Sequence, residues 1–162
     1  MGASDRQARA GGADARDDAA LQPPPQRVSR LYALAAFLSL AGLADAIYLT
    51  VEHLSGRSVR CTVTSGCSEV LASPYATVGD YPLALLGALA YFTAFSLATL
   101  AAFGTRSAGN LLAVLVALMF ATSLWLLYLQ AFVLRAFCQY CLLSAAITTL
   151  LACLVVARRL SK

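Results

Sequence analysis

Long apolar stretches alternate with short polar segments along most of this chain. Four of these stretches, at residues 31–51, 82–103, 111–134 and 138–157, reach the length of about 20 residues that a helix needs to cross the hydrocarbon core of a membrane. Isolated strands cannot span that layer, because their edges would leave backbone groups without hydrogen-bond partners. The pattern therefore predicts an all-α integral membrane protein, a four-helix transmembrane bundle.

The polar segments fall into two kinds. Residues 1–28 contain a glycine pair, three aspartates and three consecutive prolines, a composition typical of a disordered tail. Residues 29–162 then form the membrane domain. The segment 52–81 is the longest connection between spans, and we expect it to lie over the mouth of the bundle.

Composition excludes several other classes of protein. Hydrophobic residues make up 60% of the chain and charged residues 12%, which is too few charges to cover a soluble fold of this size. The net charge of +4 comes from scattered arginines without a basic run, so binding to nucleic acid is not expected. We therefore expect membrane lipid to contact most of the protein surface.

The positive charges predict an orientation. Lysine and arginine are enriched in the cytoplasmic flanks of membrane helices. One side of the predicted bundle holds both termini and the loop 104–110, and the other side holds segment 52–81 and the turn around residue 135. The first side carries Arg27, Arg30, Arg106, Arg158, Arg159 and Lys162, and the second carries Arg57, Arg60 and Arg135. We therefore expect both termini in the cytoplasm and segment 52–81 outside it.

The five cysteines occupy three places. Cys61 and Cys67 lie in segment 52–81, Cys138 and Cys141 form a Cys-x-x-Cys motif at the outer mouth of the fourth span, and Cys153 lies deeper in that span. Free cysteine is often buried, so Cys153 is expected to be a small core residue. Four cysteines on an oxidising face are typical of disulfides.

The position of Cys-x-x-Cys indicates redox chemistry. Free backbone N–H groups at a helix start stabilise a thiolate, and Arg135 places a positive charge nearby. Two other readings stay open at this point. The cysteines could form a disulfide that only staples the fourth span to the loop, or the four thiolates could bind zinc.

Further motifs accompany the cysteines in a definite order. The first span ends in Tyr48, Leu49, Thr50 and His53, and the loop continues after Cys67 with Val70, Ser73 and Tyr75. The start of the second span contains Gly79, Pro82, Gly87 and Tyr91. The last span opens with Cys138-Gln139-Tyr140-Cys141. From about residue 31 to residue 157 this order resembles the vitamin K epoxide reductase family in its bacterial form.

The resemblance implies a thiol oxidase of the bacterial inner membrane. Such an enzyme reoxidises a secreted, thioredoxin-like (DsbA-like) protein and passes the electrons to membrane quinone, either ubiquinone or menaquinone. By this resemblance Cys67 forms the mixed disulfide with the partner, Cys61 attacks Cys138, and the released Cys141 meets the quinone. Relatives often carry a fused thioredoxin-like domain, which is not present in these 162 residues, so a separate partner is expected.

The quinone pocket should be apolar with a few polar groups. The candidates near the outer surface are Ser73, Pro82, Tyr91, Tyr128, Phe137 and Tyr140. Packing or an interfacial aromatic belt is the alternative role for the aromatic residues, and helix capping for Ser73. Asp45 is an acid inside the first span and hence a functional candidate, with a structural hydrogen bond as the alternative. His53 could shuttle protons at the interface.

Two other functions remain alternatives. The first is a vitamin K epoxide or quinone reductase that runs in the opposite direction, and the second is a membrane scaffold with structural disulfides only. The vertebrate enzymes hold vitamin K with an asparagine and a tyrosine, and the positions that match them here are Leu83 and Ala145. These replacements speak against reduction of an epoxide.

Overall fold

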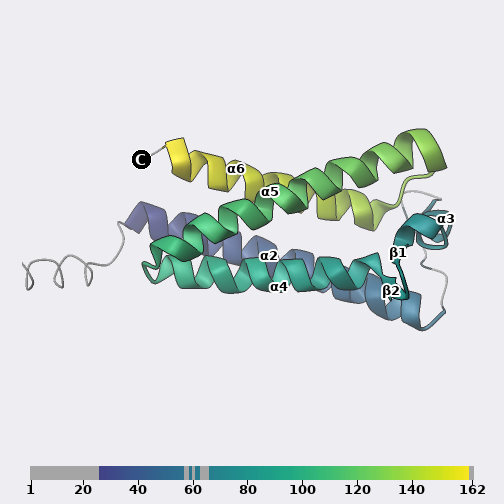
Figure 1. The fold of residues 1–162 in the computed structure, drawn as a ribbon, viewed down its shortest axis with the longest axis horizontal. Coiled ribbons are helices and arrows are strands. Elements are labelled where there is room, and N and C mark those ends of the chain that lie inside the picture. Colours follow the sequence, from purple (N-terminus) through teal and green to yellow (C-terminus); the bar gives the residue numbers. More distant parts are fainter. Residues whose placement is uncertain (1–25, 57–58, 60, 63–65, 161–162) are drawn as a thin grey trace, which may run out of the picture.

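The computed structural model describes residues 26–56, 59, 61–62 and 66–160. Four long helices run along the molecule: α2 (Gln26–Leu54), α4 (Leu83–Ala102), α5 (Arg106–Tyr128) and α6 (Gln139–Leu160). Within this part of the chain they are the helices long and apolar enough to cross a membrane, α5 together with its extension to Leu134. Figure 1 shows them side by side as one bundle. The predicted four-helix membrane fold is confirmed.

The helix boundaries differ from the expected ones at several places. Helix α2 begins at Gln26 instead of residue 31, so part of the expected tail is helical, and the remaining tail residues 1–25 lie outside the described residues. Helix α5 begins at Arg106, so most of the predicted loop 104–110 is helical. Apolar stretches mark only the part of a helix within lipid, whereas backbone hydrogen bonds can continue beyond it.

The third span ends in an unusual way. Its last residues form a π-helix, η2 (Leu129–Leu134), which is a wider coil than the α-helix. Arg135 then takes a left-handed backbone conformation, with φ of 51°, and the chain turns toward α6. The sequence predicted a single uninterrupted helix here. This local widening becomes important because it carries Gln130.

Small residues allow the helices to approach closely. Ala94 and Ala98 of α4 are completely buried. A Cβ atom at Gly42 of α2 would collide with the ring of Tyr91, which is itself buried against α2. Close approach through small residues is a main source of helix packing in lipid, where the hydrophobic effect between helices is weak. Many large apolar side chains point outward, as expected for a surface in contact with lipid.

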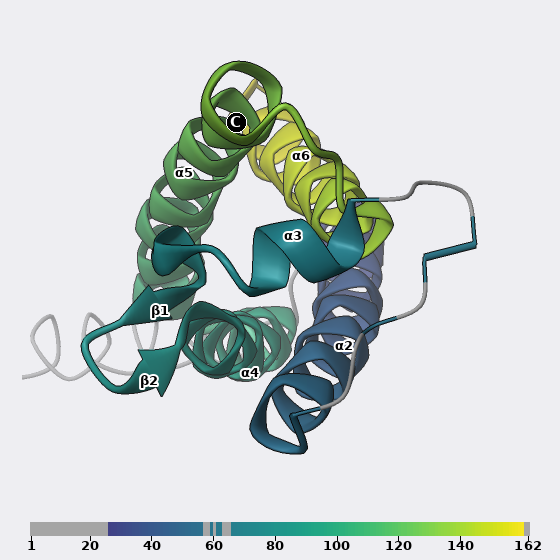
Figure 2. The same cartoon turned by 90° about the vertical axis from the view of Figure 1, so that its right-hand side faces the viewer.

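Segment 52–81 covers one end of the bundle, as predicted. Its described residues include the short helix α3 (Cys67–Leu71), the turn η1 (Pro74–Ala76) and a hairpin of β1 (Thr77–Val78) and β2 (Tyr81–Pro82). Figure 2 shows α3 crossing over the ends of the helices. We call this end of the bundle the thiol end, because it holds Cys67, Cys138 and α3.

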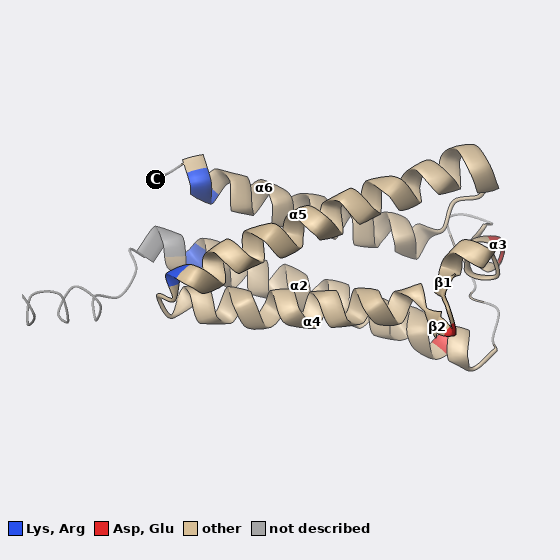
Figure 3. Ribbon diagram, in the orientation of Figure 1, with Lys and Arg blue, Asp and Glu red and all other residues tan. Residues whose placement is uncertain are grey.

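Charged residues are distributed unequally between the two ends. Arg30, Arg106, Arg158 and Arg159 gather at the end opposite the thiol end, close to the last described residues (Figure 3). The arginines at positions 57 and 60, which were expected at the thiol end, lie outside the described residues. The orientation prediction depends on the larger number of arginines at the end that holds both terminal segments.

Candidate functional site

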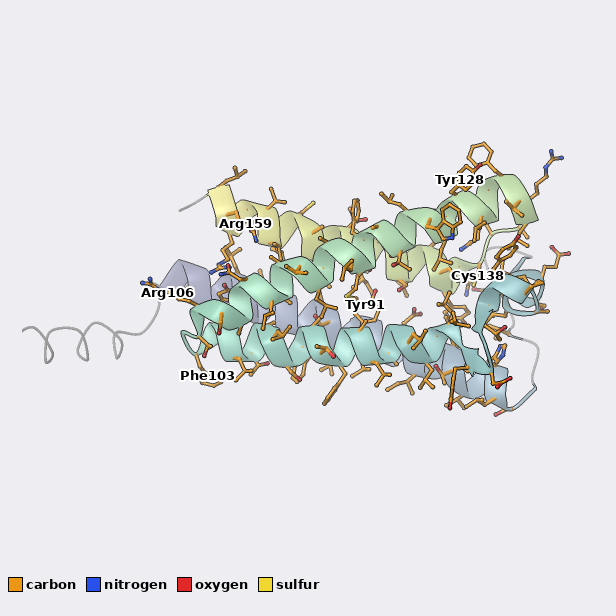
Figure 4. All side chains as sticks on the ribbon, viewed as in Figure 1. Tyr91, Phe103, Arg106, Tyr128, Cys138 and Arg159 are labelled. Atoms are coloured by element: carbon orange, nitrogen blue, oxygen red, sulfur yellow. A yellow bond between two sulfur atoms is a disulfide. The ribbon has the colours of Figure 1, made fainter. Side chains whose placement is uncertain are left out.

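Cys138 is the residue at which the last helix begins. Its carbonyl accepts the N–H of Leu142 at 3.0 Å, although α6 itself starts one residue later, at Gln139. The expected position of the motif at a helix start is therefore correct. Cys138 is 0% exposed and lies at the thiol end beneath α3 (Figure 4).

The surroundings of Cys138 favour its thiolate form. A hydrogen bond from the Cys141 side chain is the main cause that lowers the pKa of Cys138, with further contributions from the backbone N–H groups of Tyr140 and Cys141. Burial opposes these effects without cancelling them. Arg135 is exposed and is not among the groups that shift this pKa, so the hydrogen bonds of the helix start account for the thiolate and Arg135 does not.

Gln130 holds the Cys-x-x-Cys motif in place. Its side chain is 2% exposed in the π-helix, and its Oε1 accepts the N–H of Cys138 at 3.1 Å. The same side chain hydrogen-bonds the sulfur of Cys141. Sequence reasoning did not single out this residue. The available signal was a lone amide side chain in an otherwise apolar span, because such groups find polar partners when they are buried in a membrane.

The loop cysteines are joined in a disulfide. Cys61 and Cys67 are bonded, with their Cα atoms 5.8 Å apart. The bond lies within the loop and does not connect it to α6, so the stapling disulfide that was considered as an alternative is not present. Cys138 and Cys141 are both free thiols. Among the described residues no three His, Cys, Asp or Glu side chains are arranged to hold a metal ion.

The two cysteine pairs are neighbours in space. Cys67 and Cys138 belong to one buried cluster, against which Cys61 and Cys141 also pack. Gly66 lies so close to the backbone of Phe137 that an added Cβ would be 2.7 Å from its nitrogen. The tertiary structure thus brings together cysteines that are more than seventy positions apart along the chain.

A second contact connects the loop to the start of α6. The N–H and the hydroxyl of Thr62 donate to Oε1 of Gln139, at 3.0 and 3.3 Å. Thr62 follows Cys61 and Gln139 follows Cys138, so this contact holds one cysteine of each pair on neighbouring segments. Cys61 is half-buried, whereas Cys67 is only 1% exposed.

An apolar cavity of about 150 Å³ opens beneath the loop. Residues from all four long helices line it, together with α3, η1 and β2. Its polar lining groups are Asp45, His53, Ser73, Tyr75, Tyr91, Ser123, Gln130, Cys141 and Ser144. Cys141 lines this cavity, whereas Cys138 does not and packs toward the loop cysteines. The Cys-x-x-Cys motif therefore connects a thiol environment on one side with an apolar cavity on the other.

Three of the six candidates for the quinone pocket line the cavity. Ser73 and Pro82 lie on its wall near the loop, and Tyr91 lies deeper, between the helices (Figure 4). The hydroxyl of Ser73 donates to the carbonyl of Val70 at 2.7 Å, so it also makes the local turn contact that was considered as its alternative role. The hydroxyl of Tyr91 is hydrogen-bonded to Ser144 and Thr148, at 2.8 and 2.9 Å.

The other three candidates lie elsewhere. Tyr128 is 51% exposed and packs with Trp125 and Phe132 in an aromatic row that points away from the bundle (Figure 4). Tyr140 packs against Tyr48, with their ring centroids 5.2 Å apart. Phe137 is exposed and does not line the cavity. The aromatic row fits the interfacial belt that was considered for these residues.

Two predictions about buried residues in the spans have different outcomes. Cys153 is exposed on the lipid-facing side of α6, so its expected place in the core is wrong. The face of a helix that a lone residue occupies depends on how that helix is rotated in the bundle, which the apolar pattern of a membrane span does not specify. Asp45 is buried in the cavity wall, and one of its carboxyl oxygens, Oδ2, has no hydrogen-bond partner among the described residues.

Comparison with known families identifies the family of this chain. Residues 33–156, which include most of all four spans and all five cysteines, match the model of the vitamin K epoxide reductase family. Members of that family are oxidoreductases that combine disulfide and quinone chemistry in a membrane. With its four membrane helices and two neighbouring cysteine pairs, this chain is a multi-pass membrane protein that belongs to the vitamin K epoxide reductase family.

Proposed function

We propose that the protein is a membrane thiol oxidase that reoxidises a secreted, thioredoxin-like protein and transfers the electrons to membrane quinone. The observation that carries this proposal is the position of the Cys-x-x-Cys motif. Cys138 packs against the loop disulfide, and Cys141 lines the apolar cavity. One pair of thiols can therefore exchange with protein thiols on one side and meet a lipid-soluble oxidant on the other.

The proposed cycle begins at the loop disulfide. A thiolate of the partner attacks Cys67, which forms a mixed disulfide and releases Cys61. The second thiol of the partner then resolves that bond, so the partner leaves oxidised. Cys61 attacks Cys138 and releases Cys141, and Cys67 finally attacks Cys61 to restore the loop disulfide and free Cys138.

The cycle ends at the cavity. Cys138 and Cys141 form a disulfide again, and the two electrons reduce a quinone to a quinol. The low pKa of Cys138 supports this exchange, because a thiolate of low pKa is a good leaving group. In the proposed cycle, the state that precedes transfer to quinone has the Cys61–Cys67 disulfide together with free Cys138 and Cys141 thiols.

Access to Cys67 requires movement of the loop. Cys67 is the first residue of α3 and its side chain is buried against the bundle, so the partner cannot reach its sulfur in the arrangement described here. Helix α3 has only five residues, so it is a short element that can move as a unit. We propose that α3 swings away from the backbone of Phe137 when the partner binds.

The direct test is quinone reduction by the purified protein. With a reduced thioredoxin-like protein as the electron donor and ubiquinone or menaquinone as the acceptor, we expect quinol to form in a one-to-one ratio with disulfide in the donor. Quinol is measured by its absorbance and donor thiols by alkylation. Oxidation of the donor at the same rate with and without quinone would contradict the proposed coupling.

Orientation is a second prediction. We propose that the protein lies in a bacterial inner membrane with both termini in the cytoplasm and the thiol end outside. Arg30, Arg106, Arg158 and Arg159 gather at the opposite end, whereas the thiol end has Arg135 among the described residues. After mild reduction of intact cells, a membrane-impermeant thiol reagent should label Cys61 and Cys67. Labelling of these two cysteines only in inverted vesicles would overturn the orientation and, with it, the proposed secreted partner.

Reduction of vitamin K epoxide is not part of the proposal. Leu83, at the position of the asparagine in the vertebrate enzymes, lines the cavity with an apolar side chain. Ala145, at the position of the tyrosine, is buried in α6 and does not line it. Neither residue can donate a side-chain hydrogen bond to an epoxide or a quinone oxygen.

A further inference from the structure

The most unusual polar group in the bundle is the carboxyl of Asp45. It lies in α2 within the cavity wall and is 9% exposed. Its Oδ2 atom is buried without a hydrogen-bond partner among the described residues. A buried polar atom without a partner is costly, so an acid in this state within a membrane span suggests a functional role.

The cavity offers no positive charge that would balance a carboxylate. None of the described lining residues is lysine or arginine, and His53 is the only basic side chain among them. An unpaired anion is much more costly in such surroundings than a neutral acid. These surroundings favour the neutral, protonated form of Asp45, which lines the space that an apolar ligand would fill.

Asp45 is also close to the redox-active thiols. Its carboxyl interacts electrostatically with both Cys138 and Cys141, and with Tyr91 on the adjacent helix α4. Asp45 and Cys141 line the same cavity, so the acid shares this space with the sulfur that opens into it. A quinone positioned to accept electrons from Cys141 would have an oxygen within reach of this carboxyl.

Reduction of a quinone requires two electrons and two protons. The dithiol supplies both electrons when the bond between Cys138 and Cys141 forms. Cys141 supplies one proton, but Cys138 reacts as a thiolate and has already released its own. A second proton must therefore come from another group in the cavity.

We propose that Asp45 is the general acid that supplies this second proton to the quinone oxygen, an inference that rests on the proposed quinone reduction. Cys138 thiolate, Cys141 thiol, quinone and neutral Asp45 are converted into a disulfide, quinol and Asp45 carboxylate. The carboxylate then regains a proton from water at the thiol end. His53 lines the same cavity two helical turns closer to that end, about 12 Å along α2, and is suitably placed for proton exchange.

The test separates the two half-reactions. Protein whose Cys138 and Cys141 are reduced is mixed rapidly with quinone, and quinol formation is followed. Asp45→Asn keeps the size of the side chain but cannot donate a carboxyl proton, so this step should become about a hundredfold slower or more. Oxidation of the reduced partner by the oxidised variant, without quinone, should proceed at the wild-type rate. Asp45→Glu should recover most of the quinone step, which a purely packing role would not allow.

Two further measurements complete the test. The wild-type quinone step should be slower in D₂O, and Asp45→Asn should lose this isotope effect or change it. Asp80→Asn is the matched control, because Asp80 is exposed in the hairpin and should leave both half-reactions unchanged. Quinone reduction by Asp45→Asn at the wild-type rate would overturn the proposal for Asp45 alone. Absence of quinone reduction in the wild-type protein would instead overturn the proposed function on which it rests.

Discussion

Replacement of Cys141 by serine should abolish quinone reduction and trap a disulfide between Cys61 and Cys138. In the proposed relay, Cys61 attacks the bond between Cys138 and Cys141, and the released Cys141 later restores that bond. Serine cannot form a disulfide with Cys138, so Cys138 is left as a single thiol next to the loop pair. The two pairs are in one buried cluster, and a disulfide needs Cα atoms within about 7 Å. The thiolate of Cys138 then attacks Cys61 of the loop disulfide, which forms the Cys61–Cys138 bond and releases the thiol of Cys67.

Peptide mapping under non-reducing conditions identifies this species. The cross-link should be absent from wild-type protein and should form in oxidised Cys141→Ser before any reductant is added, together with a free thiol at Cys67. Cys153→Ser is the matched control, because Cys153 lies on the lipid-facing side of the same helix, and this variant should reduce quinone at nearly the wild-type rate. If Cys141→Ser contained only the Cys61–Cys67 bond under all conditions, the loop disulfide would be static and the relay would be disproved.

Replacement of Gln130 and of Gln139 by leucine should slow two different steps of electron transfer. Gln130→Leu removes the acceptor for the N–H of Cys138 and the hydrogen bond to Cys141. A buried donor without a partner costs about 1–3 kcal/mol, so transfer to quinone should become about tenfold to a hundredfold slower. Gln139→Leu instead removes the acceptor for Thr62 and loosens the loop. It should slow transfer from the loop pair to Cys138.

Rapid mixing measures both steps separately. Quinol formation by reduced protein reports the first step, and loss of partner thiols without quinone reports the second. The two variants carry the same substitution, so loss of polarity in general affects them equally. A Gln130→Leu variant with a normal quinone step would show that the π-helix has no part in positioning the thiols. Equal defects of both variants in both steps would indicate a general loss of structure.

Several features of the protein follow from the sequence alone. Four apolar stretches of about 20 residues or more predict membrane helices, because a helix of this length crosses the hydrocarbon core and satisfies its own backbone hydrogen bonds. The same reasoning places Cys138 and Cys141 at a helix start, where backbone N–H groups stabilise a thiolate. The order of short motifs around the cysteines was sufficient to identify the family, which the family comparison confirmed.

Only the tertiary structure decided how these parts meet. The apolar pattern of a membrane span is similar on every side, so it does not indicate which residues face the interior. For this reason Cys153 was expected in the core, whereas it lies on the surface of the bundle. For the same reason the sequence did not indicate the role of Gln130, which depends on a π-helix and on a hydrogen bond with the backbone of Cys138.

The different surroundings of Cys138 and Cys141 also depend on packing. Sequence spacing indicated that Cys141 lies one helical turn deeper than Cys138, but depth alone does not create a cavity. The cavity exists because the four helices and the covering loop leave space beside Cys141, with the unpaired carboxyl of Asp45 in its wall. The sequence by itself therefore determined the membrane fold and the reactive thiols, because both depend on local patterns. The side chains that surround those thiols were decided by contacts between distant segments, which only the folded bundle brings together.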